Sequence, residues 1–418
     1  MALDQFSADQ SATRPHDTAA PPSPAPQSGV VVVGLLASLV LGGVVWLRSG
    51  GVTATLFAVG LAFGFVLFHS RFGFTSAWRQ LVAVRQGAGL RAHMLMLAVA
   101  ATLFAPILAT GASFGAGTAP TASLAPIGFG VLVGAFLFGA GMQIGGACAS
   151  GTLFAVGSGQ SAIVLTLGGF VIGSVLGAYT FDFWALDLPS FAPVSLADTG
   201  AGYLGAWLIT MTAIGAVVAV TYGVARGRTV PPAGRPATAH GPARALRGSW
   251  PLWVGALGLA GLNALTLWLS GSAWGITSAF ALWGSKLLDL VGVDVTAWPY
   301  WVDRMASYDA GVLGDTTSVM DLGIMLGALV ASAAAGAWTL HRRIPGRLAL
   351  GAVIGGILMG YGARIAYGCN IGAYFAGIAS FSLHGWIWGV LALLGTVVGL
   401  RLRPLFALGN PRPTDSVC

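Results

Sequence analysis

Two of the three cysteines of the chain lie in glycine-rich runs that resemble each other. Cys148 lies in "IGGACASG" and Cys369 lies in "IAYGCNIG". Residues 130–151 align without a gap on residues 351–372, and in this register the two cysteines coincide. A lone buried cysteine usually serves as a small apolar side chain, but the paired placement favours a second role. A thiol at each of two matched points can make weak S–H contacts to a passing solute.

Polar residues and glycines flank the two cysteines. Arg364 aligns with Gln143, and an arginine at membrane depth can hold an anion through its planar fork of donors. The alternative for this arginine is to snorkel to the outer interface. Asn370, Gly146 and Gly368 are candidates for the same path, whereas glycines outside the cysteine segments are better explained by close helix packing.

A second motif also occurs twice. "GFTSA" at residues 73–77 and "GITSA" at residues 275–279 each follow a predicted spanning helix. Each opens a segment that is too short or too polar to cross the bilayer. Their hydroxyl groups either line a polar path or cap short helices, and the four residues concerned are Thr75, Ser76, Thr277 and Ser278.

Little in the sequence points to metal or redox chemistry. No cysteine pair has metal-ligand spacing, which excludes a zinc ribbon or a four-cysteine iron–sulfur cluster made by this chain alone, and we expect neither a metal nor a cofactor. The last cysteine, Cys418, lies in a polar tail and is expected to play no part. Lys286 and Asp289 are expected to pair at the outer surface. Asp321, at a predicted helix edge, is the one acid that approaches the membrane interior.

The composition is that of a membrane protein. Of the 418 residues, 56% are hydrophobic and 8% are charged, against about 25% charged in an ordinary soluble domain. We predict an all-α polytopic membrane protein with about ten spanning helices, at residues 29–47, 52–69, 92–110, 124–142, 161–181, 202–224, 250–270, 320–340, 348–366 and 382–402.

The charges of the connecting loops predict the orientation. The net charge of +7 comes mostly from arginines in alternate short loops, and aspartates fill the other loops. This pattern indicates topology rather than a nucleic-acid partner, and the positive-inside rule places both termini in the cytoplasm.

The composition also divides the chain. We expect a disordered tail without a signal peptide over 1–28, a first transmembrane half over 29–225, an Arg- and Pro-rich cytoplasmic linker over 226–249, a second half over 250–403 and a C-terminal tail over 404–418.

The two halves are predicted to be inverted copies of each other. In this topology the first cysteine segment follows a helix that runs inward, and the second follows a helix that runs outward. Oppositely oriented repeats with interrupted helices at equivalent places are typical of transporters whose site lies near the membrane midplane. Short re-entrant helices that begin in these glycine-rich segments would direct free backbone N–H groups inward and favour an anion.

The motifs resemble those of a known family. "GGACASGTL", "GYGARIAYGCNIGAYFAGIASFS" and "RFGFTSAWR" are similar to segments of the YeeE/YedE family of bacterial inner-membrane proteins, whose characterised members take up thiosulfate. The resemblance covers about residues 52–402. It implies an hourglass-shaped bundle with cysteines along a central path, and here Cys148 and Cys369 match them. Many members carry a further cysteine near the positions of "GFTSA" or "GITSA", where this chain has Thr and Ser.

The resulting hypothesis is a multi-pass inner-membrane transporter, not an enzyme, for thiosulfate or a similar sulfur anion. The family resemblance also implies a small cytoplasmic sulfurtransferase as a partner. The alternatives are a transporter of a selenium compound, a membrane thiol protein that relays sulfane sulfur or electrons, and a non-catalytic membrane subunit or channel. A relay enzyme is disfavoured because neither Cys148 nor Cys369 has a histidine or carboxylate beside it in the sequence to act as a base.

Overall fold

The structure is a computed structural model that describes residues 24–114, 117, 119–227, 230–231, 241, 243–340 and 343–413. Within these residues, nine helical segments are long and apolar enough to cross a membrane. The described strands are β1 (Ile127–Gly128) and β2 (Ser190–Phe191), which pair antiparallel. The predicted class, an all-α polytopic membrane protein, is therefore confirmed.

Every predicted spanning segment corresponds to a long helix. The first segment of the nine, Ser28–Val84, contains the first two predicted spans, because both belong to one helix that Gly50 interrupts with φ 83° and ψ 177°. The long helices are α1 (Ser28–Ser70), α3 (Ala88–Thr110), α4 (Phe129–Ile144), α6 (Ser161–Tyr179), α7 (Gly202–Ala225), α9 (Leu252–Ser270), α13 (Thr316–Ala334), α14 (Gly346–Ile365) and α16 (Leu383–Leu402).

The helix predicted at 320–340 lies a few residues earlier in the chain. The Asp315 carboxylate accepts a hydrogen bond from the backbone N–H of Ser318 at 2.8 Å, which caps α13 and fixes its start. The helix ends before Gly336, whose φ of 68° is left-handed.

Shorter elements connect the long helices. The short α-helices are α2 (Phe74–Val84), α5 (Ala149–Gly157), α8 (Ala243–Arg247), α10 (Thr277–Leu290), α11 (Pro299–Val302), α12 (Met305–Gly314) and α15 (Ala376–Ala379). Two π-helical turns, η2 (Phe183–Asp187) and η4 (Asn370–Phe375), and two 3₁₀ turns, η3 (Leu196–Asp198) and η5 (Arg403–Phe406), complete the described chain. The described residues exclude 1–23, most of the linker between α7 and α8, and 414–418. Much of the predicted N-terminal tail, cytoplasmic linker and C-terminal tail therefore lies outside the described residues.

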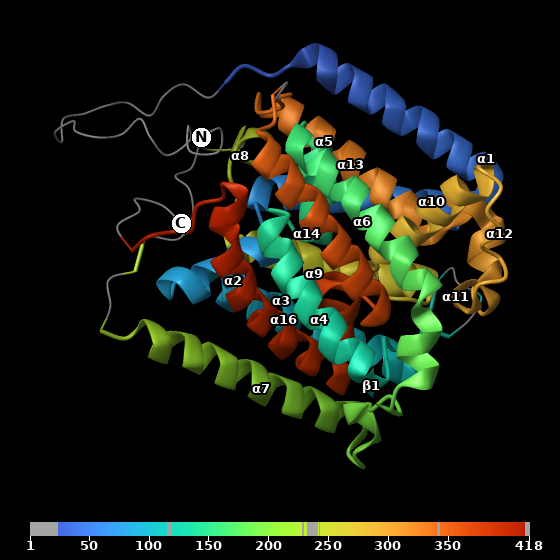
Figure 1. Ribbon diagram of the computed structural model, residues 1–418, viewed down its shortest axis with the longest axis vertical. Helices are drawn as coiled ribbons and strands as arrows, with labels where there is room; N and C mark the ends of the chain where they lie inside the picture. The colour runs from blue at the N-terminus through green and yellow to red at the C-terminus, as the bar shows by residue number, and fades with distance from the viewer. Residues whose placement is uncertain are drawn as a thin grey trace.

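Helices from the two halves pack in matching pairs. Helix α1 packs on α13 and α3 packs on α9, while α6 packs on α14 and α4 packs on α16. Contacts between α4 and α14, and between α1 and α9, join the halves (Figure 1). All of these contacts join the two halves. Since the sequence alignment places α4 opposite α14, the contact of α4 with α16 corresponds to the contact of α14 with α6.

Glycines make these helix pairs unusually close. A Cβ atom added to Gly173 of α6 would lie 2.1 Å from the carbonyl oxygen of Ile357 on α14, and one added to Gly139 of α4 would lie 1.9 Å from that of Ala392 on α16. No side chain fits at such distances, so backbone lies against backbone. This agrees with the interpretation that glycines outside the cysteine segments serve helix packing.

Two helices lie on the outside of the bundle. The first part of α1 and the whole of α7 run along opposite edges of the molecule in Figure 1. Their outward residues are large and apolar, including Leu39 and Leu47 on α1 and Leu204 and Val220 on α7, all of them exposed. Such surfaces suit the hydrocarbon of a lipid bilayer.

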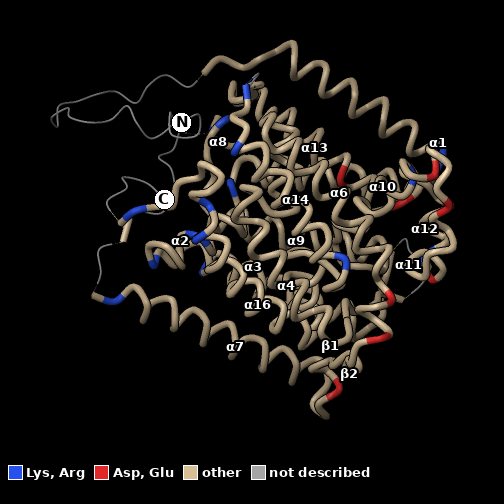
Figure 2. Tube along the Cα trace, viewed as in Figure 1, with Lys and Arg blue, Asp and Glu red and all other residues tan. Residues whose placement is uncertain are grey.

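Charged residues separate toward two ends of the bundle. Figure 2 shows most arginines near α2 and α8 and most aspartates near α10, α11, α12 and β2. This separation is the spatial form of the loop pattern from which the orientation was predicted. Few charged side chains are buried in the described chain, and these are Asp321, Arg364 and Arg403.

Candidate functional site

The two cysteines begin matching helical turns. Cys148 precedes α5 with φ −89° and ψ −173°, and Cys369 precedes η4 with φ −95° and ψ −170°. Each follows a break with left-handed backbone, at Gly146 with φ 83° and at Gly368 with φ 149°. Only glycine adopts these angles without strain, so the glycines interrupt the helix and the cysteines restart it.

Both thiols are buried and reduced. Cys148 is 1% exposed and Cys369 is 0% exposed, and both are free cysteines. The Cys148 sulfur lies 3.6 Å from the Ser150 hydroxyl, and the Cys369 sulfur accepts a hydrogen bond from the backbone N–H of Ile371 at 3.4 Å. In this conformation the thiols are therefore shielded from solvent and are not joined by a disulfide.

The structure brings the two cysteine segments together. Helix α5 contacts η4, and both cysteines belong to the same buried apolar cluster. Segments separated by some 220 residues in the sequence thus meet in the core of the bundle.

A matched pair of hydrogen bonds supports each segment. Gln143, near the end of α4, donates from its amide nitrogen to the carbonyl oxygen of Thr75 at 3.1 Å. Arg364, at the aligned position of α14, donates to the carbonyl oxygen of Thr277. In each half, the residue ahead of the cysteine turn thus holds the first turn of the short helix that begins at "GFTSA" or "GITSA". The alignment of Gln143 with Arg364 indicated a shared position, but not this contact.

Arg364 does not snorkel to the outer interface. Its side chain is buried and its second terminal nitrogen donates to the Tyr300 hydroxyl. The Tyr300 ring lies 4.8 Å from the guanidinium carbon of Arg364 and 4.5 Å from that of Arg304, within cation–π range. The Arg364 Nε has no partner, which leaves one buried donor available. Tyr300 could not be found from the sequence, because it lies 64 residues from Arg364 in the chain.

The remaining predicted residues have different environments. Asn370 is 0% exposed and neither its amide oxygen nor its amide nitrogen has a partner. The Thr75 hydroxyl is also buried without a partner. The Ser76 hydroxyl donates to the Gly73 carbonyl oxygen at 3.0 Å, a local bond of the capping kind, whereas Ser278 and Gly146 are exposed. Asn370 and Thr75 thus retain hydrogen-bonding capacity in the core.

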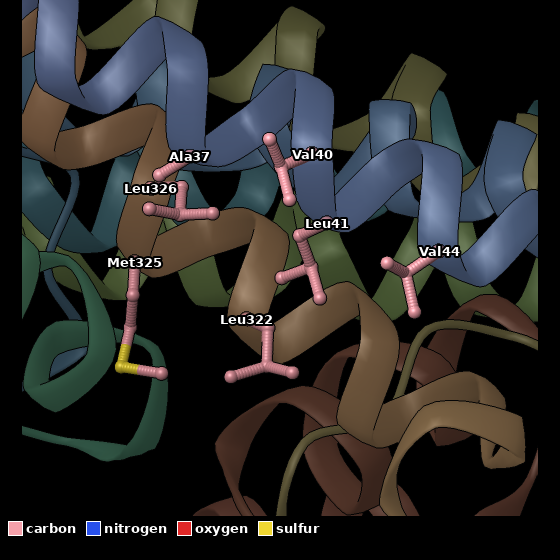
Figure 3. Close-up of a pocket in the computed structure, with 7 residues that line it drawn as sticks. All are labelled: Ala37, Val40, Leu41, Val44, Leu322, Met325 and Leu326. Atoms are coloured by element: carbon pink, nitrogen blue, oxygen red, sulfur yellow. The ribbon is translucent and has the colours of Figure 1, made fainter.

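An apolar surface groove is distinct from this site. It has a volume of about 440 Å³ and lies between α1 and α13 (Figure 3). Its lining is entirely apolar and consists of Ala37, Val40, Leu41, Val44, Leu322, Met325 and Leu326. The groove contains neither cysteine and suits a lipid chain better than a polar solute.

These features define a class of protein, a polytopic helical membrane protein with two matched thiol segments in contact in its core. Comparison with known sequences then assigns the family. The Sulphur transport family matches residues 69–398, and the chain belongs to this family, which is the family that the motifs indicated.

Several curated relatives are similar to the chain. The thiosulfate transporter TsuA of Spirochaeta thermophila is 28% identical over 357 residues, which are 81% of this chain and 94% of that protein. TsuA of Escherichia coli is 27% identical over 356 residues, 80% of this chain and 90% of its own length. The probable transporter YedE of Escherichia coli is 34% identical over 142 residues. The chain covers only 35% of the length of that YedE.

Proposed function

We propose that this protein imports thiosulfate, or a related sulfur-containing anion, across the bacterial inner membrane. The observation that carries this proposal is the pair of free thiols at the starts of two matching helical turns that meet in the core. Two relatives named thiosulfate transporters, each aligned over at least 80% of this chain, support the same substrate class.

The chemistry of the two segments suits a soft anion. A thiol offers a weak S–H contact to sulfur, and a transported solute must bind loosely enough to leave. The buried charge of Arg364 attracts the anion, while the unpartnered amide of Asn370 and the hydroxyl of Thr75 offer donors to its oxygens. In this mechanism the solute passes from one thiol to the other between two inverted repeats.

The arrangement in the membrane is part of the proposal. Both termini and the linker lie in the cytoplasm, with the arginines of Figure 2 on that side. A small sulfurtransferase that meets the chain there would receive the imported sulfur. The core would open alternately to each side, with helices from both halves, 29–225 and 250–403, moving together where they pack as pairs.

Uptake of labelled thiosulfate in a strain unable to import it tests the proposal. Cys148→Ala and Cys369→Ala are each expected to abolish uptake while membrane expression stays unchanged, because each removes one contact of the path. Cys418→Ala is the matched control, since it removes the remaining cysteine, and it is expected to keep full uptake.

Other outcomes discriminate among the alternatives. Full uptake by both core variants would remove the thiols from the mechanism. Competition by selenite that exceeds competition by thiosulfate would reassign the substrate, with sulfate and sulfite as further competitors. A persulfide on Cys148 or Cys369 during turnover, detected by intact mass, would favour the sulfur-relay hypothesis.

A further inference from the structure

Asp321 is a buried acid to which the transport path assigns no role. It lies on α13, its side chain is 0% exposed, and neither carboxyl oxygen has a hydrogen-bond partner. Asp321 is the only acidic residue among the buried polar residues of the described chain. Asp315, at the start of the same helix, differs because its carboxylate is used as a helix cap. The sequence placed Asp321 at a helix edge, but the structure places it in the core.

The surroundings of Asp321 connect it to the cysteine segments. Helix α13 packs on α5, the helix that starts at Cys148, and a Cβ on Gly157 of α5 would lie 2.1 Å from the Met325 carbonyl oxygen of α13. Asp321 lies one helical turn before Met325 on the same helix, and α5 in turn contacts η4, which starts after Cys369. The carboxyl group therefore lies on the helix that packs against the first cysteine segment, and α5 links this helix to the second cysteine segment.

No ionisable group on the neighbouring elements neutralises Asp321, because its oxygens have no partner. Besides α5, helix α13 packs on α1, α8, α10 and α12. Lys286 of α10 instead lies 3.5 Å from the ring centroid of Tyr308 on α12. The charged or titratable groups of these elements, of Asp321's own helix and of their N-terminal caps are Cys148, Asp315, Lys286, Asp289, Arg304, Tyr308, Asp309, Arg48, His69, Arg244 and Arg247.

This environment favours a neutral carboxyl group. An ionised carboxylate without a donor in an apolar interior is far less stable than the neutral acid, so the group carries a proton in this conformation. An anion that arrives nearby favours the protonated form further, because like charges repel. By linkage, the bound proton must strengthen anion binding to the same extent.

We propose that Asp321 is the proton-binding site of a proton–anion symport, in which the proton enters the cell together with the sulfur anion. The inference rests on the proposed transport function. Each accompanying proton cancels one negative charge of the solute, which reduces the work done against an inside-negative membrane potential. Asp321 releases the proton when the path opens to the cytoplasm and water reaches the carboxyl group.

The test uses the full-length protein purified into liposomes, with labelled thiosulfate outside. An acidic exterior is expected to increase the initial uptake rate of the wild type at least fivefold, compared with liposomes at the same pH inside and outside. A pH-sensitive dye in the lumen is expected to report acidification when thiosulfate is added. Asp321→Asn is expected to lose the stimulation and the acidification. It keeps exchange of labelled for unlabelled thiosulfate without a gradient, because the amide mimics the protonated acid.

Asp309→Asn, at an exposed aspartate of α12, is the control and is expected to behave as the wild type. The proposal is overturned if Asp321→Asn keeps the stimulation, or if wild-type uptake is insensitive to the gradient. Should Asp321→Asn fail to fold, the dye measurement on the wild type decides, since thiosulfate uptake without lumenal acidification excludes symport. A wild type that moves no thiosulfate at all would instead contradict the transport function itself.

Discussion

The two cysteine segments share a backbone but differ in the polar groups that support them. In the first half, the neutral amide of Gln143 holds the Thr75 carbonyl, and Arg403 donates to the carbonyl oxygen of Gln143 at 2.7 Å. In the second half, the charged Arg364 holds the equivalent carbonyl and donates to Tyr300 as well. The repeated sequence thus fixes the course of the chain, while the charge near the thiols is supplied by one half only.

The two halves also differ in the length of the segment that follows the short helix α2 or α10. Between α2 and α3 the first half has only residues 85–87, whereas between α10 and α13 the second half has residues 291–315 with α11 and α12. This additional segment carries Tyr300 and Trp301, which pack in a buried aromatic cluster, and it places Tyr300 on Arg364. The arginine is therefore held in the core by a structure that the first half does not have.

Among variants that change the support of the cysteine segments, the largest effect is expected from making the second half resemble the first. Arg364→Gln removes the buried charge and leaves the Tyr300 hydroxyl without its donor, while the glutamine amide can still donate to the Thr277 carbonyl as Gln143 does to that of Thr75. Loss of a buried hydrogen bond from a charged group corresponds to about 2 kcal/mol, so uptake of labelled thiosulfate is expected to fall at least tenfold.

Gln143→Ala provides the matched comparison, because it removes a neutral hydrogen bond of about 1 kcal/mol. Its uptake is expected to fall only about fivefold at equal expression, since 1 kcal/mol is close to that factor. Equal losses of uptake in the two variants would show that Gln143 and Arg364 both act only by holding the short helices in place. The charge of Arg364 would then have no role in thiosulfate uptake.

A smaller effect is expected from the glycine that follows each cysteine by three residues. A Cβ on Gly151 would lie 3.2 Å from the Cys148 sulfur, whereas a Cβ on Gly372 meets no heavy atom within 4 Å. Gly151→Ala is therefore expected to displace the sulfur and lower the thiosulfate uptake rate about threefold, a typical consequence of overpacking by about 1 kcal/mol or less. Gly372→Ala serves as the control and should keep the wild-type rate, and the opposite order would contradict the comparison.

The smallest effect is expected from Tyr300→Phe. The substitution removes the hydroxyl group that accepts from Arg364 but keeps the ring beside both arginines. The loss is expected to be about 2 kcal/mol of stability, because the bond is to a charged group, and it is measured as a lower melting temperature in detergent. Uptake is expected to fall less than twofold, because the charge of Arg364 remains. An effect as large as that of Arg364→Gln would mean that the hydroxyl itself contacts the anion.

Much of the fold was predictable because membrane-spanning helices are set by local composition. The ten predicted spans correspond to helices, and the gap-free alignment of the cysteine runs anticipated the matching turns at Cys148 and Cys369. The support around Arg364 was not predictable, because Tyr300 comes from a segment with no counterpart in the first half. The burial of Asp321 was missed because Asp315, rather than a residue nearer the predicted start, caps α13.

The close backbone contacts at glycines between helices limit how this molecule can change shape. Where Gly173 meets Ile357 and Gly139 meets Ala392, there is no layer of side chains that could slide or repack. Gly134 of α4 meets Gly362 of α14 in the same way, with an added Cβ 2.5 Å from the Gly362 carbonyl oxygen. Helices α4, α6, α14 and α16 would therefore travel together as a rigid block in any opening of the core. Movement then falls to the joints between blocks, such as the interruption at Gly50 and the short turns that begin at the two cysteines.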